Sequence, residues 1–430
     1  MFQRTADAYR PGTRALAREY YVSAGIFAAE QERIFAAQWN CVGRASRLAA
    51  PGDYLVRSIA GESIVVVRGH DEVIRAFFNV CRHRGTRLCT EPAGRVDRVI
   101  QCPYHAWTYS TEGALVGAPH MQDVEGFDRA AYPLHAAAVA EHDGFVFVAL
   151  DPSRPFADWF APMADRLRRF DLGGLEVWHR AEYEVAANWK LVCENYSECL
   201  HCPVIHPELA SRLPYESGAN DLVEGPFLGG YMRIADPHES ATLTGRACAP
   251  PIAADVAERR RAYYYSVMPN LLVSIHPDYV NYYLLTPLAP DRTLIESEWL
   301  FRTRGENRSE RSERSERSGR SKESVPNANA PNANAPNANV PNANVPNDPN
   351  SPNDPNAFNP SDAVALWDLV NRQDWQIIEL GQQGVASRRY VPGPYSARES
   401  ISAAWDAEYL RLMAGPPEGP SPDGPTRRGR

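Results

Sequence analysis

The sequence predicts an α+β fold in two parts: a small all-β domain over residues 41–155, and a larger helix-over-antiparallel-sheet (helix-grip) domain. Two observations predict it. Short strand patterns rich in Val and Phe recur between residues 41 and 150, as at Ser63–Arg68 and Phe145–Leu150. The second half instead orders a helix, several strands and a long C-terminal helix, which suits helices packed on an antiparallel sheet.

The elements follow in order along the chain. Residues 13–40 place Ala, Arg, Glu and Ile at helical spacing, so segment 1–40 is predicted to be a helical part of the larger domain. A helix at Phe156–Phe170 opens with acids and ends in Arg. The rest of the larger domain, 156–303 and 361–413, is predicted to hold strands at Tyr183–Val185, Leu271–Ile275, Asn281–Thr286 and Thr293–Phe301, and a helix at 361–383.

Two segments do not resemble a folded chain. Residues 304–360 begin with an Arg-Ser-Glu repeat and continue with a five-residue repeat first seen at Pro326–Ala330. Pro, Asn and Ser dominate there, and such a composition buries too little apolar surface to fold. We expect a disordered low-complexity insertion at 304–360 and a disordered Pro/Gly-rich tail at 414–430.

Composition limits the possible partners and the location of the chain. The net charge is −8 over 430 residues, so nothing suggests a nucleic-acid partner. No apolar run reaches the ~20 residues of a membrane span, and the N-terminus lacks a targeting segment, so we expect a cytoplasmic protein without membrane contact. Of the eight cysteines, Cys193, Cys199 and Cys202 crowd one segment. We expect these three to be free buried thiols, and a thiolate metal site there is a weaker alternative.

Four residues form two mixed metal-binding motifs. Cys81 and His83 make C-x-H, and Cys102 and His105 make C-x-x-H, with 18 residues between the two motifs. Two Cys on one iron and two His on the other define a Rieske [2Fe–2S] cluster, which carries one electron at a time. A structural Cys₂His₂ zinc site is the alternative, but zinc usually takes both sulfurs from one short knuckle.

A second group of ligands lies at His201 and His206. Five residues apart on a regular helix is about 140° around the axis, so these rings converge only if the helix breaks, and we expect Pro203 to break it. Glu198, three residues earlier, is expected to share the helical face of His201. Two His and one carboxylate form the facial triad of non-haem Fe(II) oxygenases.

The carboxylate must come from elsewhere in the chain. We choose Asp374, in a helix-like stretch with Trp367 and Trp375 nearby, and keep Asp368 and Asp362 as the next choices.

With both motifs in this order, the chain resembles the α-subunit of a Rieske non-haem iron oxygenase as far as about residue 413, apart from the insertion. The resemblance includes D-x4-E-x2-Q at Asp374, Glu379 and Gln382. It implies that Cys81, His83, Cys102 and His105 hold the [2Fe–2S] cluster, and that His201, His206 and Asp374 hold the mononuclear Fe(II).

The resemblance also implies a homotrimer in which Glu198 bridges His201 and His105 of the partner subunit. Glu rather than Asp at this place resembles the branch that oxidises quaternary amines such as glycine betaine, carnitine, choline and stachydrine. Asn195 is expected near the iron or as a backbone cap. Two or three tyrosines of the larger domain would line a cage for the cation. Lys190 is expected either to pair with an acid near the iron or to lie on the surface.

The expected activity is therefore N-demethylation or hydroxylation of a small quaternary ammonium substrate with O₂. The alternative is an aromatic-ring-hydroxylating dioxygenase α-subunit. Electrons would come from an NAD(P)H-dependent flavin or iron–sulfur reductase, because no G-x-G-x-x-G follows a strand in this chain. A pure electron carrier and a zinc-bearing binding module are two further classes. The H-x4-H motif disfavours the carrier.

Overall fold

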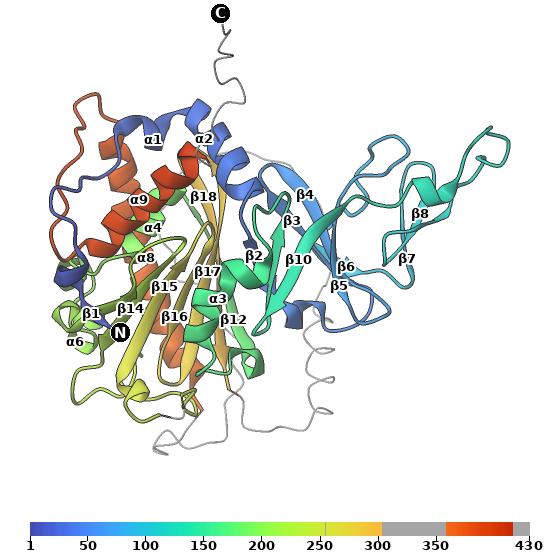
Figure 1. Ribbon diagram of the computed structural model, residues 1–430. Coiled ribbons are helices and arrows are strands. Elements are labelled where there is room, and N and C mark those ends of the chain that lie inside the picture. The colour runs from blue at the N-terminus through green and yellow to red at the C-terminus, as the bar shows by residue number, and fades with distance from the viewer. Residues whose placement is uncertain (254, 303–357, 416–430) are drawn as a thin grey trace, which may run out of the picture.

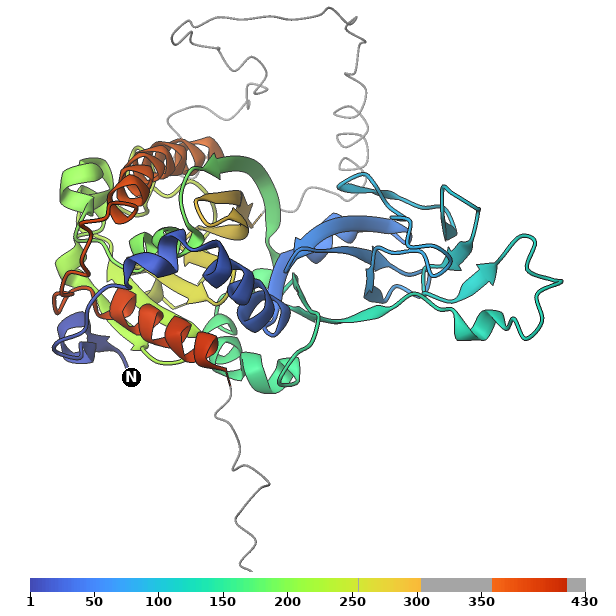
Figure 2. The ribbon, with the colours of Figure 1, turned by 90° about the horizontal axis from the view of Figure 1, so that it is seen from above.

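The computed structural model of the protein describes residues 1–253, 255–302 and 358–415. The predicted α+β fold is confirmed: a small β domain projects from one side of a larger domain of helices on an antiparallel sheet (Figure 1). Seen from above, the small domain extends away from the helical layer (Figure 2).

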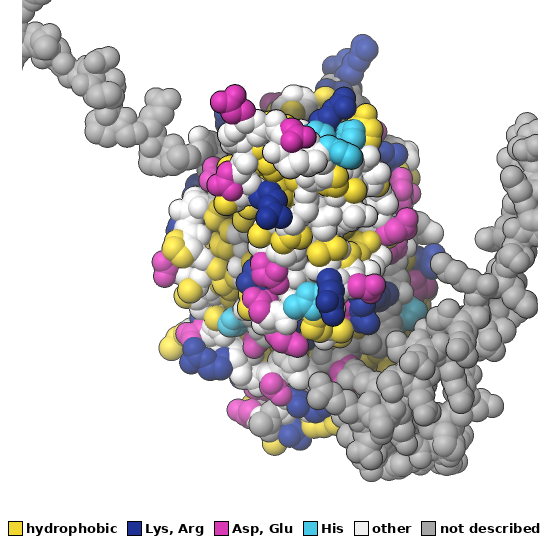
Figure 3. All heavy atoms as spheres, turned by 90° about the vertical axis from the view of Figure 1, so that its right-hand side faces the viewer, with side chains coloured by type: hydrophobic (Ala, Val, Ile, Leu, Met, Phe, Trp, Pro, Cys, Tyr) yellow, Lys and Arg dark blue, Asp and Glu magenta, His cyan; other side chains and the backbone are white. Residues whose placement is uncertain are grey.

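The small domain combines a seven-stranded sheet with a three-stranded one. The larger sheet has the order β2 (Asn40–Arg44), β11 (Phe145–Ala149), β10 (Ala136–His142), β5 (Ile74–Phe78), β4 (Glu62–Arg68), β3 (Asp53–Ile59), β6 (Ala93–Arg95). The smaller sheet consists of β7 (Val99–Gln101), β8 (Thr108–Ser110) and β9 (Leu115–Gly117). Figure 3 looks onto this side of the molecule, where histidine side chains lie among side chains of both charges.

The larger domain is built on an eight-stranded antiparallel sheet. Its order is β1 (Gln3–Arg4), β13 (Ala219–Leu222), β14 (Phe227–Arg233), β15 (Arg261–Val267), β16 (Leu271–Ile275), β17 (Tyr279–Ala289), β18 (Arg292–Phe301), β12 (Glu176–Val185). The main helices are α1 (Arg18–Val22), α2 (Ala24–Glu30), α3 (Phe156–Leu167), α4 (Trp189–Tyr196), α5 (Cys202–Ile205), α6 (Pro207–Arg212), α8 (Pro360–Val385) and α9 (Ser400–Ala414).

The sheet is covered on both faces, which explains the apolar strands. Side chains of a strand alternate between faces. On β17, Tyr282 and Leu284 join the core that contains β11 and α3, while Tyr283 and Leu285 join the core under α4, α8 and α9. The central strands therefore lie between the small domain with α3 on one side and the helical layer on the other.

The structure corrects the predicted helix at 13–40. Ser23 ends α1 and caps α2 by accepting the N–H of Ile26, and a π-helical turn, Gln31–Ala36, follows α2. Because Ser23 caps a new helix inside the periodic pattern, the single helix predicted from periodicity is two helices in the structure. The predicted strand at 183–185 is the end of a longer β12, and strands β13 to β15 and helix α9 were not predicted.

The predicted insertion at 304–360 lies outside the described residues except for its last three. Phe358 packs edge-on against Trp178, with ring centroids 5.1 Å apart, and lies 6.1 Å from Phe301. Pro360 begins α8. Of the predicted tail at 414–430, only Ala414 and Gly415 are described.

A buried ion pair ties α2 to α4. Lys190 Nζ lies 2.6 Å from Glu30 Oε1, and both side chains are fully buried. Trp189 and Tyr409 donate further hydrogen bonds to the same carboxylate. Burial lowers the pKa of Lys190, and the contact with Glu30 opposes that shift. The expectation of a surface lysine is wrong, and the partner of Lys190 comes from the N-terminal segment.

Removing one member of this pair should strongly destabilise the fold. Lys190→Ala leaves Glu30 charged without its partner, and breaking a buried pair in this way costs about 3–5 kcal/mol. Denaturant unfolding of the purified protein would measure the loss. The matched control is Arg4→Ala, which breaks an exposed pair with Asp7 and should leave the midpoint nearly unchanged. Equal midpoints for both variants would contradict this role of the buried pair.

Candidate metal centres

Two loops of the small domain have the same backbone pattern. Cys81 N–H donates to the carbonyl of Thr86 and Gly85 N–H donates to the carbonyl of Cys81, at 2.8 and 3.0 Å. In the second loop, Cys102 N–H donates to Trp107 and Ala106 N–H donates to Cys102, at 2.8 and 3.1 Å. The fifth residue of each loop has positive φ, 73° at Gly85 and 55° at Ala106, which lets each chain turn tightly.

These loops place thiols inside and imidazoles outside. Cys81 and Cys102 are each 3% exposed, whereas His83 is exposed. The rings of His83 and His105 lie 4.8 Å apart, and His83 stacks on Trp107. Two sulfurs and two imidazoles from adjoining loops are the donor set of a Rieske [2Fe–2S] cluster, so the residues present fit the group.

The second set of ligands lies where α4 ends and two short helices follow. The structure corrects the expected break at Pro203: this residue lies in the first turn of α5, where proline is tolerated. The chain instead leaves the helix at Ser197–His201 and again at His206, which has φ −127° and ψ 64°. The residue before a proline avoids the helical region, and Pro207 follows His206. Glu198 also lies outside any helix, so its proximity to His201 comes from the turn rather than from a helical face.

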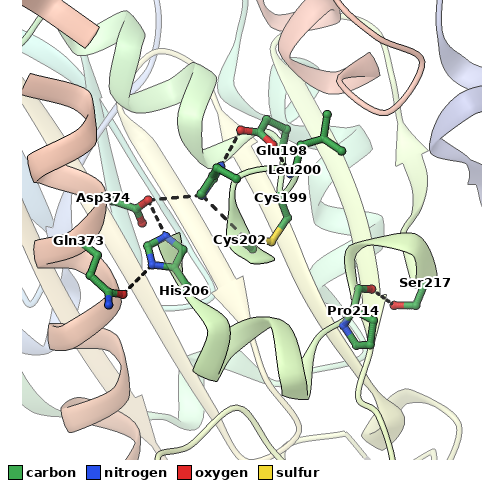
Figure 4. Close-up of a disulfide and its surroundings, with 10 residues drawn as sticks. Glu198, Cys199, Leu200, Cys202, His206, Pro214, Ser217, Gln373 and Asp374 are labelled. Atoms are coloured by element: carbon green, nitrogen blue, oxygen red, sulfur yellow. Dashed lines mark hydrogen bonds and ion pairs between the residues drawn. A yellow bond between two sulfur atoms is a disulfide. The ribbon is translucent and has the colours of Figure 1, made fainter. Parts of the chain in front are cut away.

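Asp374 of α8 contacts both histidines, and Figure 4 shows it beside His206. Its Oδ1 lies 2.9 Å from His206 Nε2 and 3.4 Å from His201 Nε2. Ligand atoms of all three residues lie within 4.8 Å of one another, and the structure identifies them as a group that could hold a metal ion. The other two candidate acids have other partners: Asp368 accepts from Tyr183, and Asp362 accepts from Thr244.

The outer nitrogen of each imidazole is also engaged. His201 Nδ1 lies 2.6 Å from Glu198 Oε1, and His206 Nδ1 lies 2.7 Å from Gln373 Oε1. Both oxygens can accept the Nδ1–H of their imidazole, so that Nε2 of each ring faces the Asp374 carboxylate and becomes an acceptor once it loses its proton. Such partners orient metal-binding histidines. Three acceptors repel one another unless a cation lies between them, so the arrangement fits a divalent metal.

The pKa values of His201 and Asp374 also indicate that this group of side chains favours a positive charge. Burial lowers the pKa of His201, but the bonds to Asp374 and Glu198 outweigh it and raise this pKa to about 10. Burial alone would raise the pKa of Asp374, yet its bonds to the two histidines bring it below the usual value. A metal ion would have to displace the proton that the raised pKa keeps on His201, so the affinity of the site for the metal should rise with pH.

Helix α8 holds this geometry through a row of side chains. Glu379 Oε1 accepts the N–H of Ala186, and Gln382 Oε1 accepts the N–H of Asn188, each at 3.0 Å. The D-x4-E-x2-Q pattern therefore has a physical meaning: its second and third members fix α8 on the segment that leads into α4. Sequence reasoning missed Gln373, although its place beside Asp374 was a signal.

The structure corrects the expectation of free thiols. Cys199 and Cys202 form a disulfide, with Cα atoms 5.0 Å apart, while the other six cysteines, including Cys193, are free. The bridge encloses Leu200 and His201, and Cys202 Sγ lies 3.8 Å from His201 Nε2. These two sulfurs are therefore not thiolate metal ligands in this state.

A cavity of about 140 Å³ opens over the triad. Among its lining residues are His201, His206, Asp374, Glu198 and Asn195, so all five expected residues of this site share one cavity. The walls are rich in aromatic side chains: Tyr196, Tyr215, Tyr231, Tyr264, Tyr283, Trp367 and Trp375.

Comparison with known families agrees with this geometry. Residues 38–128 match the Rieske [2Fe-2S] domain, and residues 172–329 and 336–415 match the ring hydroxylating alpha subunit (catalytic domain). The chain belongs to the ring-hydroxylating alpha-subunit family. This alpha subunit is an oxidoreductase whose cofactors are a Rieske [2Fe–2S] cluster and a mononuclear iron.

Individual relatives are similar over different lengths. The glycine betaine monooxygenase oxygenase subunit of Chromohalobacter salexigens is 30% identical over 433 residues, covering 91% of this alpha subunit and 84% of the relative. The carnitine monooxygenase oxygenase subunit of Acinetobacter pittii is 41% identical over 197 residues, 45% of this chain and 53% of its own.

Solved structures share the fold. A quaternary ammonium Rieske monooxygenase superposes with a TM-score of 0.71 at 24% identity, over 96% of this chain and 100% of its own. A naphthalene 1,2-dioxygenase superposes with a TM-score of 0.65 at 18% identity, over 94% of this chain and 93% of its own. Among the described residues of this alpha subunit, no helix is both long and apolar enough to cross a bilayer.

Gln373 should control metal affinity. Gln373→Ala removes the acceptor for His206 Nδ1–H, and loss of such a partner typically weakens metal binding about 10- to 100-fold. Iron titration of metal-free protein would measure this, while the visible spectrum of the Rieske cluster should not change. The control is Gln383→Ala, an exposed position on the same helix. Unaltered iron affinity in Gln373→Ala would show that the contact does not support the metal.

Proposed function

We propose that this alpha subunit is the oxygenase component of a multicomponent monooxygenase that oxidises an N-methyl group of a small quaternary ammonium compound. The observation that carries the proposal is the aromatic cavity directly over His201, His206 and Asp374. A trimethylammonium group has no hydrogen-bond donor and is recognised by aromatic faces. The relatives named for glycine betaine and carnitine support the same substrate class.

Each predicted ligand has a role in this proposal. Cys81, His83, Cys102 and His105 would hold the cluster; His201, His206 and Asp374 would hold the iron. When bound, and supplied with electrons from an NAD(P)H-dependent reductase, the iron activates O₂ for oxidation of a C–H bond. Tyr196, Tyr264 and Tyr283 line the cavity and would hold the cation, so that a methyl group faces the triad. Hydroxylation of that methyl gives a carbinolamine, which releases formaldehyde.

Transfer of the electron requires a second chain in this proposal. The end of the small domain at β8 and the helix α6 beside His206 lie on opposite sides of the molecule in both views (Figures 1 and 2). Tyr104, in the second cluster loop, is 57% exposed, and Val204, between the two histidines in sequence, is 81% exposed. We therefore propose a homotrimer in which the cluster of one subunit lies against the His201 side of the next, with Glu198 between them.

Oxygen uptake with a surrogate reductase tests the activity. We expect formaldehyde in a 1:1 ratio to O₂ with glycine betaine, carnitine or stachydrine, because each carries an oxidisable N-methyl group. Choline oxidised without formaldehyde would indicate hydroxylation at carbon. The Asp374→Ala variant should release no formaldehyde. Turnover of benzoate-type aromatics alone would contradict the quaternary amine and favour ring hydroxylation.

Glu198 should be required for electron transfer rather than for metal binding. Its Oε1 binds His201, and its side chain is 15% exposed, within reach of a neighbouring subunit. Glu198→Gln removes the charge that holds both imidazoles, so turnover should fall about 10- to 100-fold. Rapid-mixing oxidation of the reduced cluster would measure the step.

Both metal centres should remain loaded in Glu198→Gln, as judged by iron content, because the amide oxygen can still accept the Nδ1–H of His201. The control Glu182→Gln changes an exposed glutamate on β12 and should transfer electrons normally. Normal cluster oxidation in Glu198→Gln would argue against the bridge.

A further inference from the structure

The cavity over the triad contains only three charged side chains other than the histidines: Glu198, Asp374 and Arg398. The two acids are already engaged. Glu198 accepts from His201 and from the N–H of Leu200, and Asp374 contacts both histidines. Arg398, which is exposed at the edge of the protein surface, is therefore the lining charge that these contacts leave available to a ligand.

Arg398 has no acidic partner within residues 1–253, 255–302 and 358–415. Its guanidinium lies over the ring of Tyr215, with the central carbon 5.5 Å from the ring centroid. The neighbouring Glu399 is not a partner, since its carboxylate accepts the N–H of Ser396. An arginine whose guanidinium lies over an aromatic ring can keep its fork of N–H groups free for a carboxylate.

The start of helix α9 adds positive character to the same wall. Ser400 and Ile401, in the first turn, line the cavity, and the side chain of Glu399 does not cap the helix. Ser400 Oγ accepts from Asn220 Nδ2 at 3.0 Å, and both residues are buried. A helix N-terminus favours a negative group, so it reinforces Arg398.

Two polar atoms of residues that line the cavity have no partner in the part of the protein that the structure describes. Tyr264 Oη and Trp375 Nε1 are buried, and neither has a hydrogen-bond partner among the described residues. Buried polar atoms are normally paired, so water beside the bound cation is the partner expected for these two.

We propose that Arg398 binds the carboxylate of a zwitterionic substrate and makes the enzyme select quaternary amines that carry one. This rests on the proposed function and narrows it: betaine-type substrates are favoured over choline, which has no carboxylate. The aromatic wall takes the trimethylammonium end near the triad, and Arg398 with the start of α9 takes the acidic end.

Paired substrates test this directly. Glycine betaine and γ-butyrobetaine would each be compared with the neutral amide of the same molecule, which keeps the trimethylammonium group and loses the negative charge. Arg398→Gln should raise KM for the acids about 10- to 100-fold, the size expected for one charge-assisted hydrogen bond. The value of kcat should stay nearly constant, and KM for the amides should not change. Arg398→Lys should recover part of the loss, and Arg388→Gln, an exposed arginine outside the cavity, is the matched control.

The outcomes separate the two proposals. Equal KM values of the wild type for acid and amide, or an equal loss for both in Arg398→Gln, would overturn the role of Arg398 and leave amine oxidation standing. If the wild type oxidised no quaternary amine, the proposed function would be wrong. Calorimetric titration with glycine betaine needs no turnover: binding that Arg398→Gln weakens supports the carboxylate site, and no binding, or equal binding, overturns it.

Discussion

The register of α8 against the segment from Tyr183 to His206 determines the catalytic centre. Asp374 can reach both histidines only while the helix keeps this register. Asp368, Gln373, Glu379 and Gln382 hold it through bonds to Tyr183, His206, Ala186 and Asn188. Since most of these acceptors bind backbone or ring N–H groups, a shift of one residue along α8 would break several bonds at once.

The small domain solves a related problem with two short loops. Both loops close with the same pair of backbone bonds, yet the histidine follows its cysteine by two residues in one loop and by three in the other. The two imidazoles are thereby brought together at the surface while both sulfurs remain buried. The buried thiols would therefore hold one side of the cluster, and the two imidazoles would face the surface, where an electron can pass to another group.

Local patterns in the sequence predicted much of this structure. Strand β16 coincides with the predicted 271–275, and the helix predicted at 361–383 matches α8 within two residues at either end. The grouping of His201, His206 and Asp374 was also predicted, because the ligand types are visible in the chain, although the predicted helix break at Pro203 was wrong. The residues that escaped prediction meet only in three dimensions. Glu30 and Lys190 are 160 residues apart, and Arg398 meets Tyr215 across the cavity mouth. The Cys199–Cys202 bridge depends on a turn that breaks the helix, which spacing alone did not reveal.

The aromatic contact between Phe301 and Phe358 has a consequence for the length of chain that can join β18 to α8. It brings the last residue of β18 and the approach to α8 together, so the chain leaves and re-enters the domain at nearly one point. For a flexible loop in general, doubling the length costs only about 0.6 kcal/mol of closure entropy. Residues added between these two points therefore need not move either β18 or the register of α8.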